Sequence, residues 1–115
     1  MKIIIAGSRG FSDYDLLRAK CDYWFSNTSD IEIVCGGTRG ADLLGKQYAQ
    51  ECGYGIKMFI PDWDGLGKRA GMVRNTQMGD YADALAAFWD GKSRGTKHMI
   101  DYARQKGLKI RIQMF

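Results

Sequence analysis

The strongest evidence for the fold is the segment Ile3-Ile4-Ile5-Ala6-Gly7-Ser8-Arg9-Gly10, near the start of the 115-residue sequence. Four apolar residues in a row, closed by a glycine, are typical of a strand that is buried on both faces. The glycines and the hydroxyl that follow suit a tight turn from this strand into a helix. Strands of this kind occur almost only in parallel sheets that helices cover, so the stretch indicates an α/β protein.

The rest of the chain repeats this alternation of strand and helix. Apolar runs predict four further strands, at residues 31–35, 56–60, 84–89 and 108–112. Apolar residues three and four apart predict four helices, at residues 13–25, 41–52, 72–81 and 96–106. With right-handed crossovers, these elements form a three-layer α/β sandwich: a mainly parallel five-stranded sheet with helices on both faces. No linker divides the chain, so we expect one domain over residues 1–115.

The composition excludes several classes of protein. Hydrophobic residues make up 45% and charged residues 26%, as in a globular protein. Apolar runs fall far short of the roughly 20 residues of a membrane span, and the first run is too short for a signal peptide. We therefore expect a cytoplasmic protein with no membrane partner. The net charge of +4 permits an anionic ligand without requiring nucleic acid.

The three cysteines, Cys21, Cys35 and Cys52, are widely spaced and form no C-x-x-C pair. Zinc binding and dithiol redox chemistry are therefore not indicated, and buried reduced thiols are expected. Glycine is more informative: 15 of 115 residues are glycine, against a usual share of roughly 7%. Most of this excess lies in turns that follow predicted strands.

A hydroxyl, an arginine and a glycine recur in that order after three of the predicted strands. Glycine lets a ligand approach the backbone, the free N–H groups at a helix start favour an anion, and arginine offers a planar fork for phosphate. We therefore predict an anion-binding cradle, although the pattern is neither a Walker A motif nor a G-x-G-x-x-G fingerprint. Its candidate residues are Gly7, Ser8, Arg9, Gly36, Gly37, Thr38, Arg39, Gly40, Asp42, Asp90, Ser93, Arg94, Gly95 and Thr96.

Residues 62–71 form a glycine-rich loop that suits a flap over a nucleotide. Trp63 could stack on a base, with Trp89 as the other candidate, and Lys68 could meet phosphate. Arg74 and Asn75 open the next helix and complete the set of candidate ligand-binding residues. The carboxylates of Asp62 and Asp64 could hold Mg²⁺ beside a nucleotide, but two loop carboxylates do not by themselves predict a metal site, and no cofactor is expected.

No pair of residues stands out as a general acid and base. Arg74, Asp42 and Asp90 are the catalytic candidates, because a carboxylate at a strand end or helix start could reach a ribose. Asp42 could instead stabilise its helix start through the helix dipole, or orient Arg39. His98 is the only histidine, and no nucleophile elbow and no Cys/His pair with a supporting acid is visible.

Four separated segments resemble the YspA/YpsA-related branch of the SLOG superfamily: Gly7–Arg9, Gly36–Asp42, Pro61–Asn75 and Trp89–Thr96. The resemblance implies a Rossmann-like fold, a pocket for a nucleotide or nucleotide-derived ligand, and self-association as a homodimer. Arg74 resembles an arginine of the related LOG-type phosphoribohydrolases. The position of their catalytic Glu is Met99 here, which cannot transfer a proton. Residues 36–42 and Arg74-Asn75 are also similar to motifs of the DprA/SMF domain, which handles single-stranded DNA.

The resulting expectation is a sensor, sequestering or processing protein that binds a phosphorylated, nucleotide-derived small molecule. Two alternatives stay open. One is an enzyme like the phosphoribohydrolases that cleaves the glycosidic bond of a nucleotide. The other is a DprA-like module that binds single-stranded DNA; the modest charge makes nucleic acid the second choice as a partner.

Overall fold

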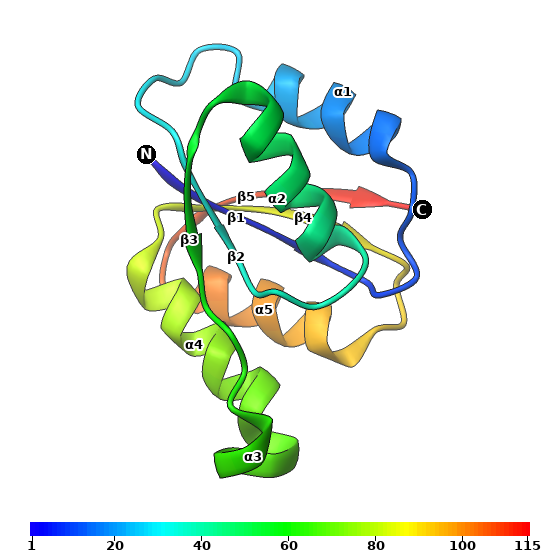
Figure 1. Ribbon diagram of the computed structural model, residues 1–115, viewed down its shortest axis with the longest axis vertical. Coiled ribbons are helices and arrows are strands. Elements are labelled where there is room, and N and C mark those ends of the chain that lie inside the picture. Colours follow the sequence, from blue (N-terminus) through cyan, green and yellow to red (C-terminus); the bar gives the residue numbers. More distant parts are fainter.

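The computed structural model describes residues 1–115 and contains one sheet of five parallel strands in the order β3-β2-β1-β4-β5 (Figure 1). The strands are β1 (Lys2–Gly7), β2 (Glu32–Cys35), β3 (Gly55–Met58), β4 (Ala84–Trp89) and β5 (Lys109–Met114). β1 lies at the centre and pairs Ile4 with Val34 on one side and with Leu85 on the other. The expected α/β sandwich with a parallel sheet is therefore confirmed.

Helices cover both faces of the sheet, and the alternation along β1 decides which core each residue joins (Figure 1). Ile3 and Ile5 pack with α1 (Tyr14–Trp24) and α2 (Ala41–Cys52). Ile4 and Ala6 pack with α4 (Ala70–Tyr81) and α5 (Arg94–Gln105). Because successive side chains of a strand point to opposite faces, one continuous apolar run contributes to two cores.

The order of the strands reverses between β1 and β4. From β1 the chain builds β2 and β3 toward one edge, and then crosses back to build β4 and β5 toward the other edge. In open α/β sheets, ligands bind beyond the carboxyl ends of the strands at such a switch point. The turns after β1 and β4 therefore flank the natural position for a site.

One expectation about local structure is wrong. Residues 62–71 are not an irregular flap, because α3 (Trp63–Leu66) and a 3₁₀ turn (Gly67–Arg69) lead directly into α4. Asp62 begins α3 by accepting the backbone N–H of Gly65 at 2.9 Å. Gly67 at φ +59° then allows the turn that joins α3 to the following helix.

Two smaller differences concern the end of β3 and the burial of one cysteine. β3 ends at Met58, two residues before the expected end, and Ile60 is exposed. Cys21 and Cys35 are buried thiols, and burial raises the pKa of Cys35 to about 12. Cys52 is only partly buried, which differs from the expectation for that residue.

None of the helices has the length and apolar character that crossing a membrane requires.

Two glycines in helices provide a test of how closely α2 packs on the sheet. A Cβ at Gly45 in α2 would lie 2.7 Å from Ile5 Cγ2, whereas a Cβ at Gly71 in α4 would make an ordinary 3.6 Å contact with Trp63. Alanine favours a helix by about 1 kcal/mol over glycine, but overpacking a core costs about 1–3 kcal/mol. We expect urea unfolding to show that Gly45→Ala lowers stability and that Gly71→Ala leaves it unchanged or raises it. Greater stability of Gly45→Ala would contradict the close packing.

Candidate functional site

A cavity of about 460 Å³ lies at the carboxyl ends of β1 and β4, where the strand order reverses. Its walls come from the turn after β1, the start of α5, the first turns of α4, and the α3 segment that carries Trp63. We call it the inner cavity. A more open hollow of about 600 Å³ adjoins it and is lined by Arg9, Gly37, Thr38, Arg39 and Trp63; we call this the outer cavity.

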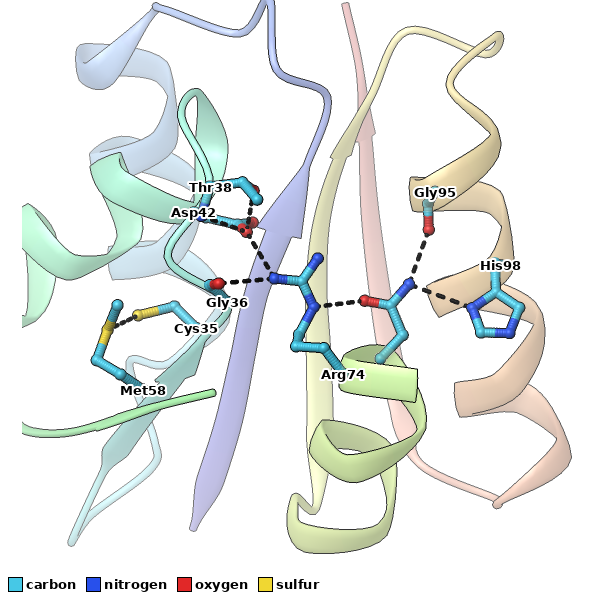
Figure 2. Close-up of polar contacts among 9 residues, drawn as sticks. Cys35, Gly36, Thr38, Asp42, Met58, Arg74, Gly95 and His98 are labelled. Carbon is cyan, nitrogen blue, oxygen red and sulfur yellow. Dashed lines mark hydrogen bonds and ion pairs between the residues drawn. The ribbon is translucent and has the colours of Figure 1, made fainter. Parts of the chain in front are cut away.

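The Arg74 guanidinium is held from both sides at the wall of the inner cavity (Figure 2). Its Nη1 donates to the carbonyl oxygen of Gly36 at 2.7 Å and lies 3.6 Å from Oδ2 of Asp42. Its Nε donates to Oδ1 of Asn75 at 3.0 Å. Arg74 thus ties α4 to the turn after β2, and the remaining guanidinium nitrogen makes no hydrogen bond within the protein.

Asp42 is buried at the start of α2, with only 4% of its side chain exposed. Its Oδ2 accepts the hydroxyl of Thr38 at 2.5 Å and the Thr38 backbone N–H at 3.4 Å. Burial raises the pKa of Asp42, while the Thr38 hydroxyl and the charge of Arg74 act in the opposite direction. Asp42 therefore orients an arginine, as expected, but this arginine is Arg74 instead of Arg39.

Asn75 extends this network from Arg74 toward Gly95 and His98 of α5, which are labelled in Figure 2. Its Oδ1 accepts a hydrogen bond from Arg74, and its Nδ2, which therefore faces α5, donates to the Gly95 carbonyl oxygen at 3.1 Å. The same Nδ2 lies 3.2 Å from Nδ1 of His98, which then acts as the acceptor. A polar chain from Thr38 through Asp42, Arg74 and Asn75 therefore joins the turn after β2 to α5.

The turn after β4 is held by Asp90, whose Oδ1 accepts the backbone N–H groups of Lys92 and Ser93, both at 2.8 Å. These two hydrogen bonds lower the pKa of Asp90, so the exposed carboxylate is ionised at neutral pH. The backbone N–H of Asp90 donates to the buried Ser8 hydroxyl at 3.3 Å, which connects this turn to the one after β1. The two turns at the switch point are thus bonded to each other.

Most candidate ligand-binding residues line the inner cavity: Gly7, Ser8, Arg9, Thr38, Asp42, Trp63, Lys68, Arg74, Asn75, Asp90, Ser93, Gly95 and Thr96. Gly37 and Arg39 line only the outer cavity. Gly36 and Gly40 line neither, because they pack behind the site: a Cβ at Gly36 would lie 1.8 Å from Arg74 Nη1, and one at Gly40 would lie 2.5 Å from the Ser8 carbonyl oxygen.

Two residues from the sequence motifs lie away from both cavities. Arg94 is exposed and lines neither, so the third copy of the triplet contributes its hydroxyl and glycine without its arginine. Trp89 donates its indole N–H to the Ser93 carbonyl oxygen at 3.1 Å and lines neither cavity. Trp63, with 47% of its surface exposed, lines both cavities and remains the aromatic candidate.

The candidate ligand-binding residues did not include the apolar and small residues of the wall, which are Ala6, Gly10, Gly71, Met72, Met78 and Met99. The spacing of Gly71, Arg74 and Met78 along α4 places them on one helix face, and this signal was available once Arg74 was chosen. Met99 is 1% exposed and belongs to the core of α4 and α5 as well as to the cavity wall.

Some charged side chains of the inner cavity are paired within the protein and others are not. Arg9 and Lys68 are exposed at the inner cavity, and neither forms an ion pair with a carboxylate. No group of three His, Cys, Asp or Glu side chains is placed to hold a metal ion. Asp62 is engaged at the start of α3, and neither it nor Asp64 lines a cavity. The free cations therefore favour an anionic ligand.

The sequence and the structure are similar to known proteins. The model of the YspA, cpYpsA-related SLOG family matches residues 1–65. The chain is 31% identical over 116 residues to the Gene 61 protein of Mycobacterium phage D29, an alignment that covers 95% of this chain and 93% of the phage protein.

Two solved structures share the fold. DNA processing protein A (DprA) from Streptococcus pneumoniae matches with a TM-score of 0.70 at 18% identity, over 96% of this chain and 49% of that chain. A predicted subunit of tRNA methyltransferase from Methanocaldococcus jannaschii matches with a TM-score of 0.50 at 12% identity, over 100% of this chain and 68% of that chain. The chain thus spans about half the length of DprA.

The Asp42–Arg74 pair can be tested by a double-mutant cycle. Breaking a buried ion pair costs about 3–5 kcal/mol, because the remaining charge stays buried. We expect Asp42→Asn and Arg74→Met each to lower the free energy of unfolding in urea at pH 7. The double variant should lose less than the sum of the two, by roughly 0.5–3 kcal/mol. Additivity within about 0.5 kcal/mol would contradict the coupling.

The same cycle has a pH dependence with a defined sign. Burial raises the pKa of Asp42, and Arg74→Met removes a charge that lowers it. A carboxyl whose pKa is raised on folding favours the folded state when protonated, and this contribution is lost as the pH rises through the pKa of the folded state. The deficit of Arg74→Met relative to the wild type should therefore shrink as the pH falls, whereas Asp42→Asn in the Arg74→Met background should remove that trend.

Proposed function

The chain belongs to the YspA, cpYpsA-related SLOG family, and we propose that it binds a nucleotide or nucleotide-derived phosphorylated ligand in the inner cavity. The observation that carries the proposal is the position of free cations at the switch point of a parallel sheet. Arg9 and Lys68 lie beside turns rich in backbone N–H groups, with no carboxylate paired to either.

In this proposal the residues of the cavity divide into two roles. Arg9, Lys68 and the backbone at the start of α5 bind phosphate, and the face of Trp63 offers stacking area for a base. Arg74 contributes its remaining guanidinium nitrogen, and Arg74 and Asn75 together hold the turn after β2 and the start of α5 at fixed positions. The buried hydroxyls of Ser8 and Thr96 line the wall between these groups and suit hydrogen bonds to a sugar or phosphate.

A binding role is favoured over hydrolysis of a glycosidic bond, because both carboxylates of the inner cavity already serve the protein. Asp42 is paired with Arg74, and Asp90 accepts two backbone N–H groups. The wall at Met99 is apolar and buried, so it supplies neither an acid nor a base. Binding without turnover suits a sensor or a sequestering protein; a homodimer and a cytoplasmic location stay predictions.

Thermal unfolding with a panel of nucleotides tests the proposal. A ligand at 100 times its Kd stabilises the folded state by about 2.7 kcal/mol, so at least one nucleotide should raise Tm by several degrees. Arg9→Gln should reduce the shift. Arg69→Gln is the matched control, because Arg69 is exposed and lines neither cavity, and it should retain the shift. A flat response across the panel would overturn the proposal.

The two alternatives give different results with the same preparation. A DprA-like module would bind a single-stranded oligonucleotide more tightly than any free nucleotide, with an affinity that falls steeply as salt rises. A phosphoribohydrolase-like enzyme would release free base from a nucleoside monophosphate. Either result would replace the proposal of a small-molecule binder.

A further inference from the structure

The inner and outer cavities adjoin each other and share three lining residues, Arg9, Thr38 and Trp63; we call the two together the hollow. The outer cavity extends this hollow toward Arg39, past the backbone of Gly37. Gly37, whose backbone has φ +78°, lines the outer cavity, and Ile60 occupies the side of its Cα where a side chain would lie. A ligand that fills only the inner cavity would leave this extension without an occupant.

The two parts of the hollow differ in charge. The inner cavity contains Asp42 and Asp90 together with its cations, whereas the outer cavity contains two arginines and no carboxylate. Arg9 and Arg39 are both exposed, and neither forms an ion pair. Like charges that share a concave surface without a counter-ion favour an anion bound between them.

The arginines follow the hollow from inside to outside. Arg74 lines only the inner cavity, Arg9 lines both, and Arg39 lines only the outer cavity. The charge of Arg9 is close enough to lower the pKa of Arg74, although burial is the larger cause of that shift. Arg74 is paired with Asp42, so the unpaired arginine charge lies at Arg9 and Arg39, in addition to that of Lys68 in the inner cavity.

We infer that the ligand is a nucleotide with at least two phosphate groups, one bound in the inner cavity beside Arg9 and the start of α5, and the next bound in the outer cavity by Arg9 and Arg39. This inference rests on the proposed function and specifies its ligand class. A nucleoside monophosphate fills the first position only. A nucleoside diphosphate, or a dinucleotide joined through a diphosphate, meets both arginines.

Calorimetric titration of the full chain with matched nucleotides tests the inference. AMP is compared with ADP, and GMP, CMP and UMP with their diphosphates, at constant ionic strength with EDTA. Because the two nucleotides of each pair carry the same base, the ratio of their affinities does not depend on which base the site prefers. For the base that binds best, we expect the diphosphate to bind at least about tenfold more tightly, as one additional charge-assisted contact would give.

Two variants assign the second phosphate to the outer cavity. Arg39→Gln should weaken the diphosphate by about tenfold more than it weakens the monophosphate. Arg9→Gln should weaken both, because Arg9 lines both cavities. Arg69→Gln, which removes an exposed arginine outside the hollow, should change neither affinity.

The outcomes separate this inference from the function on which it rests. Equal affinities for monophosphates and diphosphates would overturn the inference and leave the proposed function standing. An Arg39→Gln variant that loses the same affinity for both ligands would have the same consequence. If no nucleotide of either class binds, the proposed function fails and the inference fails with it.

Discussion

The buried ion pair between Asp42 and Arg74 is the interaction on which the arrangement of the site depends. Both groups lose hydration because they are buried, and this loss raises the pKa of the carboxyl and lowers that of the guanidinium. Their mutual attraction and the hydrogen bonds from Thr38 and to Gly36 offset part of this loss. A pair that contributes little net stability can still specify geometry, because either charge alone would be strongly unfavourable in this position.

The geometry that results joins segments that are distant in the sequence. Arg74 connects α4 to the turn after β2, and Asn75 connects α4 to α5. Ser8 connects the turns after β1 and β4. These bonds hold the walls of the inner cavity without using Arg9 or Lys68. The groups that fix the site and the groups that are free for a ligand are therefore largely different residues.

The sequence was sufficient to predict the sheet, because apolar runs that are closed by glycine have few other interpretations. It also predicted most of the cavity, since the carboxyl ends of parallel strands lie at one edge and bring their turns together. It could not predict that Asp42 pairs with Arg74, because this depends on how the first turns of α4 meet the turn after β2 at the edge of the sheet. Local sequence was equally unable to show that Arg94 lines neither cavity, or that Asp62 begins a helix within an apparent loop.

Whether the switch point of the sheet is the binding site can be tested directly by an amide NMR titration of the labelled chain with ADP. We expect the amides of Gly7, Gly10, Gly95 and Thr96 to shift together and saturate with one Kd, while those of Gly53 and Gly107, at the far ends of α2 and α5, stay in place. Shifts confined to exposed basic residues outside the cavities, without saturation at the two turns, would contradict a binding site at the switch point.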